Sequence, residues 1–321
     1  MVLGPLLARL GRAHVALPGG CNIGSRQIDL HLASLKRMGA KITTEHGYIE
    51  GEDGRLRGAV IPLDFPSVGA TENVLMAACL ADGITTIENA AREPEIIELA
   101  EFLNGMGARV SGAGTSVIKI DGVEKLHGTE HQVLPDRIEA ATLLIAGAIT
   151  GGEVKVEGVR ASHLELVLEK LKQAGARITA DATGISLKMS GRPKAVDIAT
   201  LPYPGFPTDI QPMMASFLAV SKGTSVLTEN VFENRFLYID ELNRMGADIR
   251  LDDHHAIIRG VKRLSGAPVR VPDLRAGAAL VLAGLAAEGE TVVYDKDHID
   301  RGYQDLDEKL KDLGACITKE P

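Results

Sequence analysis

Aromatic residues and positive charge are both scarce in this 321-residue sequence. Aromatic residues make up 3% of the chain, tryptophan is absent, and the formal net charge is −8 at pH 7. A surface that binds nucleic acid broadly needs clustered basic side chains and aromatic rings on which bases can stack. The composition therefore excludes a general nucleic-acid-binding surface, and no nucleic-acid partner is expected. Small anionic ligands would need arginines that cluster locally.

Cysteine is also rare: the chain has three, Cys21, Cys79 and Cys316, far apart in the sequence. An odd number without close spacing predicts neither a disulfide framework nor a metal knuckle, and it favours a reducing, cytoplasmic setting. The histidines are scattered, so no metal site is expected. Cys79 lies in the apolar stretch "LMAACLA" and is predicted to be a core residue, whereas Cys316 is predicted to lie in a strand.

Long apolar runs and glycine-rich phosphate loops are missing as well. The apolar start "MVLGPLLARLG" is too short to span a bilayer, and it lacks the basic start and the cleavage site of a signal peptide. Neither a GxGxxG nor a GxxxxGK[ST] pattern occurs, so no nicotinamide or nucleoside-triphosphate loop is expected. The sequence predicts a soluble, unexported protein with no membrane partner and no cofactor.

A repeat runs through the chain. Its signature is a leucine, three further residues, Gly-Ala, one residue and then isoleucine or valine, as in "LKRMGAKI" and "LKQAGARI". The signature predicts an amphipathic helix that ends at a glycine in the left-handed conformation, with a β-strand directly after it. A hairpin, a second, apolar helix and a returning strand complete each unit. The repeat glycines are spaced by 68, 68, 71 and 68 residues and are Gly39, Gly107, Gly175, Gly246 and Gly314.

Units of this size bury too little surface alone, so copies must pack together. We expect three units per domain, with an N-terminal domain over residues 1–134 and a C-terminal domain over 135–321. Both ends break the pattern, because "MVLGPLLARLG" matches only the interior of a second helix and "LGACITKEP" begins a hairpin that does not return. The first unit is therefore incomplete, and a preceding segment of about one period is expected to be absent from this chain.

The stretch "LPGGCNIGSRQID" places Cys21 on a glycine-rich loop with Arg26 close behind it. Glycines permit backbone conformations that other residues avoid, so the stretch is predicted to be a flexible lid rather than core. A thiol on such a lid can act as a general acid or a nucleophile, and a nearby guanidinium lowers its pKa. An incidental loop thiol is the alternative.

Eight motifs follow one another along the chain: "GGCNIG", "SVGATEN", "NAAREPEI", "PDRIEA", "FPTDIQ", "ENVFENRF", "DLRA" and "HIDRGY". In these motifs, and over essentially its whole length, the sequence resembles the enolpyruvyl transferase family. The resemblance implies a pair of inside-out α/β barrels of three repeats each, with helices inside, sheets facing solvent and the active site in the cleft between the barrels. The activity it implies is transfer of the enolpyruvyl group from phosphoenolpyruvate to the 3-hydroxyl of UDP-N-acetylglucosamine, with release of phosphate, in peptidoglycan synthesis.

One part of the family pattern has no counterpart in this chain. Family members begin with a segment that carries a Lys-Asn pair, and nothing in this sequence matches that segment. The alternative is therefore a truncated, catalytically impaired chain that at most binds a UDP-sugar. The related chemistry on shikimate 3-phosphate is disfavoured, because that branch of the family is not expected to carry the Cys21 loop.

The resemblance implies two catalytic residues. Cys21 would protonate the methylene carbon of phosphoenolpyruvate, could add to it covalently, and would be the target of the antibiotic fosfomycin. Asp209, in "GFPTDIQ", would be the general base at the sugar hydroxyl, a role that asks for a site dry enough to raise its proton affinity. Asp209 also stands at a helix entry, so a simple helix N-cap is the alternative for this residue.

Four arginines are expected to hold the anionic substrates, since the forked guanidinium matches phosphate and carboxylate oxygens. By resemblance, Arg26 and Arg301 hold phosphoenolpyruvate, and Arg275 and Arg235 support them. The alternative for Arg235 is an ion pair with its neighbour Glu233.

The nucleotide end of the site is expected at two helix starts. Ser67, Val68 and Gly69 begin a helix whose free N–H groups and dipole favour an anion, and the resemblance assigns them to the diphosphate. Many relatives have a lysine where this chain has Phe65 and a proline where it has Gln27, so these contacts are expected to differ here. The residues implied for the uracil and the sugar are Gln27, Ile28, Asp29, Leu30, His31 and the backbone of Val231. The oligomeric state is not predicted.

Overall fold

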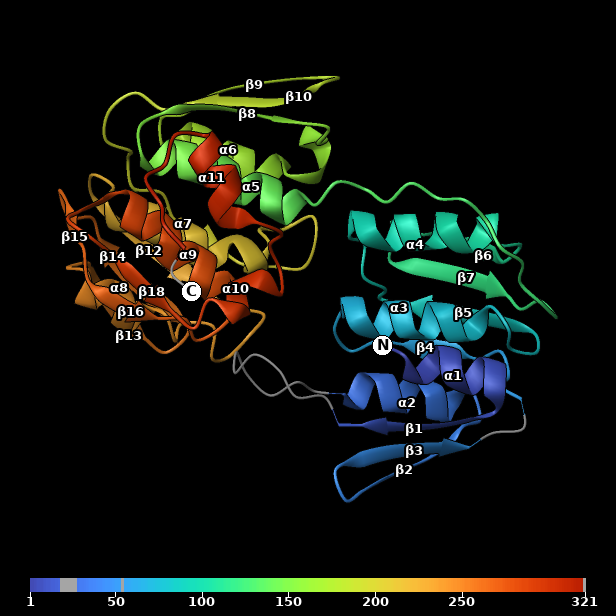
Figure 1. Cartoon of the computed structure of the whole chain (residues 1–321). Helices are drawn as coiled ribbons and strands as arrows, with labels where there is room; N and C mark the ends of the chain where they lie inside the picture. Colours follow the sequence, from blue (N-terminus) through green and yellow to red (C-terminus); the bar gives the residue numbers. More distant parts are fainter. Residues whose placement is uncertain (18–27, 53–54, 320–321) are drawn as a thin grey trace. The chain divides into compact units, whose positions relative to one another are not determined.

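The computed structural model of the chain describes residues 1–17, 28–52 and 55–319. These residues form two compact units that divide between Leu134 and Pro135 (Figure 1). Unit 1 comprises the described residues up to Leu134, and unit 2 comprises those from Pro135 onward. Each unit has its own apolar core.

Unit 1 packs its two most buried apolar helices, α1 and α3, against each other. The backbones come close at Gly4 of α1, whose N–H donates to Asn73 Oδ1 of α3 at 2.9 Å. A Cβ atom at Gly4 would lie 2.5 Å from the carbonyl oxygen of Asn73, so only glycine permits this approach. Helices α2 and α4 also contact α3. The helices of unit 1 are α1 (Leu3–Leu10), α2 (Asp29–Arg37), α3 (Val68–Ala78) and α4 (Pro94–Gly105).

Two sheets cover these helices, with strand orders β1-β3-β2 and β4-β5-β7-β6. Neighbouring strands are antiparallel except for β4 and β5, which are parallel. Burial alternates along the strands: β3 buries Ile49 and Gly51 and exposes Tyr48 and Glu50, so one face of the sheet lies on the core. The strands are β1 (Arg12–Ala16), β2 (Lys41–Glu45), β3 (Tyr48–Glu52), β4 (Val60–Pro62), β5 (Ile84–Glu88), β6 (Arg109–Ser111) and β7 (Val117–Asp121).

Unit 2 is built around three apolar helices, α5, α7 and α9, each of which contacts the other two (Figure 1). Helix α7 has the sequence "QPMMASFLA" without a charged residue, and all nine of its residues are buried. Ser216 of α7 donates from its hydroxyl to the carbonyl of Ala279 in α9 at 2.8 Å, which satisfies this polar group inside the core. The helices of unit 2 are α5 (Arg137–Ile149), η1 (Ala161–His163), α6 (Glu165–Gln173), η2 (Thr208–Ile210), α7 (Gln211–Ala219), α8 (Ile239–Arg244), α9 (Leu274–Leu285), α10 (Asp297–Asp300) and α11 (Leu306–Asp312).

The strands of unit 2 form sheets of the orders β8-β10-β9, β11-β12-β14-β13, β15-β17 and β16-β18. The pairs β11/β12, β15/β17 and β16/β18 are parallel, and the other neighbours are antiparallel. The strands are β8 (Glu153–Glu157), β9 (Arg177–Asp181), β10 (Gly184–Lys188), β11 (Ile198–Ala199), β12 (Thr224–Thr228), β13 (Asp248–Asp252), β14 (His255–Arg259), β15 (Leu264–Ser265), β16 (Pro268–Arg270), β17 (Ala287–Glu288) and β18 (Val292–Tyr294).

The predicted repeat is confirmed at all five of its glycines. They follow α2, α4, α6, α8 and α11, and their φ angles lie between 87° and 112°, the left-handed region that glycine enters without a steric penalty. A hairpin follows the first four glycines. After the fifth, residues 315–319 form no strand and pair with no other described segment. The prediction that Cys316 lies in a strand is therefore wrong, and its side chain is exposed.

Cys79 is a core residue, as predicted. It is fully buried next to the end of α3, and its Sγ donates to the carbonyl of Leu75 at 3.2 Å. Burial raises the pKa of this thiol to about 12, so it stays protonated and unreactive. Within the described ranges, no helix has the length and apolar character that crossing a membrane requires.

Candidate active site

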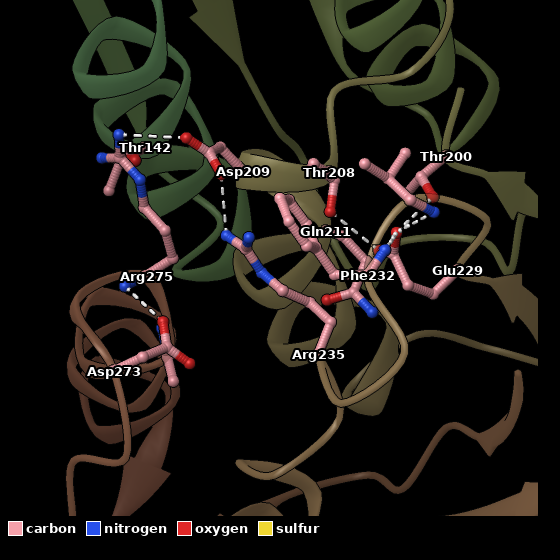
Figure 2. A network of polar contacts seen from close by, with 12 residues as sticks. Thr142, Thr200, Thr208, Asp209, Gln211, Glu229, Phe232, Arg235, Asp273 and Arg275 are labelled. Carbon is pink, nitrogen blue, oxygen red and sulfur yellow. Dashed lines mark hydrogen bonds and ion pairs between the residues drawn. The ribbon is translucent and has the colours of Figure 1, made fainter. Parts of the chain in front are cut away.

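Two of the predicted site residues of unit 2, Arg235 and Arg275, contact Asp209, which lies in the short helix η2 directly before α7 (Figure 2). Asp209 Oδ1 accepts from Arg235 Nη2 at 2.9 Å, and its Oδ2 accepts from Arg275 Nη2 at 3.2 Å. One carboxylate is thus shared by two guanidinium groups that come from distant parts of the chain. Asp209 does not cap a helix, and the carboxylate that Arg235 contacts is not that of Glu233. Both of those alternatives are wrong.

Local structure fixes each member of this group. Pro207, with φ near −66°, leads into η2, and Pro212 occupies the first turn of α7. Arg235 lies just before α8 with only 2% of its surface exposed, and its guanidinium sits 5.5 Å from the Phe232 ring. The carboxylate of Asp273 accepts from the N–H groups of Arg275 at 2.9 Å and of the next residue at 3.1 Å, which caps α9.

The electrostatics of Asp209 are opposite to the sequence-based expectation. Removal from water by itself raises the pKa of this carboxyl group, but the charges and hydrogen bonds of Arg235 and Arg275 outweigh that effect. The pKa of Asp209 therefore lies below its ordinary value. The prediction that the site raises the proton affinity of Asp209 is wrong, because two cations are in direct contact with it and 39% of its side chain stays exposed.

Arg275 is held on its other side by a buried tyrosine. The Arg275 guanidinium lies 5.2 Å from the centre of the Tyr303 ring, and the Tyr303 hydroxyl lies 3.0 Å from the hydroxyl of Thr142. Burial raises the pKa of Tyr303, so this phenol stays neutral. Burial alone would lower the pKa of Arg275, but Asp209, Tyr303 and Asp136 together outweigh it, so the pKa of Arg275 is raised. Arg275 is consequently a fixed positive charge with a defined orientation.

A hollow of about 690 Å³ opens beside this group within unit 2. Arg275 and Arg301 both line it, so the structure brings two of the predicted substrate arginines to one surface. Such a hollow admits a small molecule that carries phosphate or carboxylate groups, which forked guanidinium donors bind well. The remaining lining residues are Asp136, Asp300, Gly302, Tyr303, Gln304, Asp305 and Lys319.

In unit 1 the two predicted nucleotide segments lie next to each other. Ser67 is the N-cap of α3, and its hydroxyl accepts from the N–H of Ala70 at 3.3 Å, while Val68 and Gly69 form the first turn. A Cβ atom at Gly69 would lie 3.3 Å from the ring of His31, in the first turn of α2. Burial and then the chain's amino terminus lower the pKa of His31. Beside His31, Ile28 precedes α2 and Asp29 and Leu30 begin it.

Three predicted site residues, Cys21, Arg26 and Gln27, lie outside the described residues. Their roles remain predictions. Val231 lies within unit 2, in the segment between β12 and Arg235. Among the described residues no group of three or more His, Cys, Asp or Glu side chains could hold a metal ion.

Sequence reasoning missed Glu229, which is 4% exposed and lies two residues before Val231. The available signal was its position as the first residue of the motif "ENVFENRF", directly after the strand-like stretch "TSVLT". A buried carboxylate needs several hydrogen-bond donors. Tyr303 was also given no role, although it is the last residue of the motif "HIDRGY".

Comparison with known proteins agrees with this architecture. A family model described as EPSP synthase (3-phosphoshikimate 1-carboxyvinyltransferase) matches residues 1–310. Among solved structures, the enolpyruvyl transferase NikO from Streptomyces tendae is 28% identical with a TM-score of 0.88, over 99% of this chain and 76% of that one. EPSP synthase from Acinetobacter baumannii, at 24% identity and a TM-score of 0.74, covers 99% of this chain and 77% of that one and shares the fold.

Curated relatives are much closer in sequence. The UDP-N-acetylglucosamine 1-carboxyvinyltransferase 1 of Caldanaerobacter subterraneus is 56% identical, over 99% of this chain and 77% of its own length. The UDP-N-acetylglucosamine 1-carboxyvinyltransferase of Nocardia farcinica is 58% identical over 99% and 75%, and that of Mycobacterium tuberculosis is 55% identical over 99% and 76%. The chain therefore belongs to the enolpyruvyl transferase family, on the side of the UDP-N-acetylglucosamine 1-carboxyvinyltransferases.

Proposed function

We propose that this chain transfers the enolpyruvyl group from phosphoenolpyruvate to the 3-hydroxyl of UDP-N-acetylglucosamine and releases phosphate. Relatives of that name, at 55% to 58% identity over 99% of the chain, support the proposal. The observation that carries it is the Asp209 carboxylate held between Arg235 and Arg275, beside a hollow that Arg301 also lines. A base and anion-binding groups then meet at one place, as this reaction requires.

Phosphoenolpyruvate carries a phosphate and a carboxylate, so its site needs several fixed cations. Arg301 and Arg26 hold this substrate, and Arg275 supports them from the wall of the hollow. Arg235 is buried and contributes through Asp209 rather than by touching the substrate. The exposed position of Arg301 leaves its guanidinium free to approach an anion.

The chemistry is an addition followed by an elimination. In the addition the 3-oxygen of the sugar bonds to C2 of phosphoenolpyruvate, Asp209 takes the hydroxyl proton, and the Cys21 thiol gives a proton to the methylene carbon. In the elimination the Cys21 thiolate left by the addition takes a proton from that carbon, the C2–O bond to phosphate breaks, and phosphate leaves with the bonding electron pair. No step oxidises or reduces the protein, so the proposal includes no cofactor.

The low pKa of Asp209 restricts how it acts as a base. At neutral pH the carboxylate is ionised and ready to accept a proton, but it is too weak a base to ionise a sugar hydroxyl beforehand. Proton removal must therefore accompany formation of the C–O bond. The simultaneous proton transfer from Cys21 to the methylene carbon prevents build-up of negative charge there.

The nucleotide end of the acceptor lies on unit 1 in this proposal. Ser67, Val68 and Gly69 present the amino end of α3 to the diphosphate, and the adjoining Ile28 to His31 segment faces the uracil together with Gln27. The backbone of Val231 in unit 2 meets the sugar. In this proposal the chain acts in peptidoglycan synthesis, in the cytoplasm.

The direct test is phosphate release when the full chain is mixed with both substrates. We expect release that depends on UDP-N-acetylglucosamine and does not occur when shikimate 3-phosphate replaces it. Cys21→Ser should reduce the rate by about 100-fold or more, because a general acid contributes on that order. Cys316→Ser, which changes an exposed cysteine that is not among the proposed site residues, is the matched control and should leave the rate unchanged.

Fosfomycin gives a second readout for the same thiol, since it should inactivate the unmodified chain and the Cys316→Ser variant but form no adduct at position 21 of Cys21→Ser. Equal rates in Cys21→Ser and the unmodified chain would remove the thiol from the mechanism. Binding of UDP-N-acetylglucosamine by calorimetry, without any phosphate release, would reject the transferase activity and leave a sugar-binding chain.

A further inference from the structure

Glu229 is a buried carboxylate that the reaction scheme does not use. It follows β12 directly, it is 4% exposed, and its backbone N–H donates to the carbonyl of His254 at 2.9 Å. Burying a carboxylate costs free energy unless hydrogen-bond donors satisfy its oxygens. The donors around Glu229 therefore show which parts of the chain it holds together.

Four donors meet the two oxygens of Glu229, and they come from three separate segments (Figure 2). Oε2 accepts from the Thr208 hydroxyl at 2.9 Å. Oε1 accepts from the Thr200 hydroxyl at 2.8 Å and from the backbone N–H groups of Val231 at 2.8 Å and Phe232 at 3.1 Å. A carboxylate can accept on both oxygens at once, which a hydroxyl-bearing or apolar side chain of this size cannot do.

Three of the four donors belong to segments that the proposed reaction depends on. Thr208 immediately precedes Asp209 in η2, so its hydrogen bond fixes the turn that presents the base. Val231 and Phe232 begin the segment that runs to Arg235, the partner of Asp209. Thr200 ties the same point to the end of β11, since its hydroxyl also accepts from the N–H of Asn230 at 2.9 Å.

We propose that Glu229 is a positioning residue, which sets the distance between the Asp209 base and the Val231 backbone that meets the sugar. This inference rests on the proposed function. Glu229 does not contact substrate, because both of its oxygens are engaged inside the protein. It acts through Thr208 on one side and through the Val231 N–H on the other, so a single group aligns the sugar with the base.

Three variants separate alignment from simple stability. Glu229→Gln keeps one acceptor oxygen for the Val231 and Phe232 N–H groups, and its amide can donate to the Thr208 hydroxyl, which is able to accept. Glu229→Ala removes every contact. Thr208→Val removes only the link to the Asp209 turn and leaves the three contacts at Oε1 intact.

We expect Glu229→Ala to lower kcat by on the order of 10- to 100-fold, since a displacement of a reacting group by about 1 Å costs that much. Its KM for UDP-N-acetylglucosamine should rise as well. Thr208→Val should lower kcat several-fold with an unchanged KM for UDP-N-acetylglucosamine, and Glu229→Gln should stay within about threefold of the unmodified chain in both constants. Kinetic constants are compared at equal folded fractions, measured by circular dichroism.

The outcome that overturns the proposal is a Glu229→Ala or Thr208→Val chain that is folded and shows unchanged kcat and KM, or a Thr208→Val chain that loses only stability. Should Glu229→Ala fail to fold, Thr208→Val against Thr200→Val decides: an equal fall of kcat in both variants would reject a specific link from Glu229 to the Asp209 turn.

A readout without turnover separates this proposal from the proposed function. Amide hydrogen exchange at Val231 and Phe232, and the pKa of Asp209 followed by NMR, are measured in the chain alone. If the positioning role holds, Glu229→Ala speeds exchange at both amides by at least tenfold, and Thr208→Val shifts the pKa of Asp209 while exchange at Val231 stays slow. Unchanged exchange rates and an unchanged pKa of Asp209 in these variants would reject the positioning role, even if the unmodified chain releases no phosphate. Changed exchange rates and a changed pKa, together with no phosphate release, would reject only the transferase activity.

Discussion

Unit 1 and unit 2 are built from the same repeat, yet their central helices are buried to different extents. In unit 2, α5, α7 and α9 contact one another and every residue of α7 is buried. In the described part of unit 1, α1 and α3 pack together, and α1 buries three of its eight residues while Leu10 is 62% exposed. The difference shows that two neighbouring helices cover only part of a central helix of this repeat, whereas the three-helix arrangement encloses α7 completely.

The largest expected effect is a difference in core stability between the units. Leu218 of α7 and Leu7 of α1 are both buried, but α7 is enclosed on all sides. We expect Leu218→Ala to cost about 4 kcal/mol and Leu7→Ala about 2 kcal/mol, because a less enclosed site collapses more easily around the cavity. Denaturant unfolding with hydrogen exchange resolved by unit measures both values.

Leu10→Ala, at an exposed position of the same helix as Leu7, is the control and should change the free energy of unfolding by less than about 0.5 kcal/mol. Equal costs for Leu218→Ala and Leu7→Ala would mean that the two cores are equally well packed, and the comparison would fail.

The next effect concerns charge in unit 2. Arg235→Met keeps an apolar stem but removes a cation from Asp209, so the pKa of Asp209 should rise. The acid limb of the pH profile of kcat/KM should then move to higher pH, and the rate near neutral pH should fall by about 100-fold. Arg192→Met is the matched control, because Arg192 contacts four backbone carbonyls of unit 2 and not Asp209. If the pH profile of kcat/KM moved to lower pH in Arg235→Met, or moved equally in both variants, the assigned effect of Arg235 on the pKa of Asp209 would be contradicted.

The smallest expected effect is a difference in how stability depends on pH between a carboxyl group of unit 1, Glu72, and Asp209 of unit 2. Burial, followed by the charges of Glu95 and Glu93, raises the pKa of Glu72 on α3 above its ordinary value of 4.5. Ionised Glu72 therefore destabilises unit 1, and Glu72→Gln should stabilise it by less than about 1 kcal/mol at neutral pH. The gain should disappear as the pH falls through the raised pKa, because the two side chains are then both uncharged.

Asp209→Asn should behave in the opposite way. The stability that the Asp209 carboxylate contributes is present above its ordinary pKa of 3.8 and is lost as the pH falls through the lowered folded-state value. The free energy of unfolding as a function of pH, measured for the two variants and the unmodified chain, gives both signs. Identical pH dependence in Glu72→Gln and Asp209→Asn would show that the two carboxyl groups do not differ as described.

The sequence predicts the repeat well because its signature is local. A glycine that ends a helix and allows a strand to follow is specified by a few adjacent residues, and all five such glycines have the expected backbone conformation. The position of Cys79 in the core follows from its apolar neighbours in the same way.

The properties of the site depend on distance in space and were harder to predict. Asp209 and Arg275 are 66 residues apart, and only the packing of α7 against α9 brings them together. The sequence identified both residues but gave the wrong sign for the proton affinity of Asp209, since that sign depends on two contacts of 2.9 and 3.2 Å. Glu229 was missed because its role lies in donors from three segments.

The contact of both Arg235 and Arg275 with Asp209 has a consequence for the order of events in the proposed reaction. Arg275 lines the hollow and also contacts Asp209, so in the proposed reaction the phosphate group of phosphoenolpyruvate would bring a negative charge beside the same guanidinium. That negative charge would offset part of the positive charge that lowers the pKa of Asp209, and Asp209 would become a stronger proton acceptor. Binding of phosphoenolpyruvate would in this way raise the basicity of the residue proposed to deprotonate the sugar.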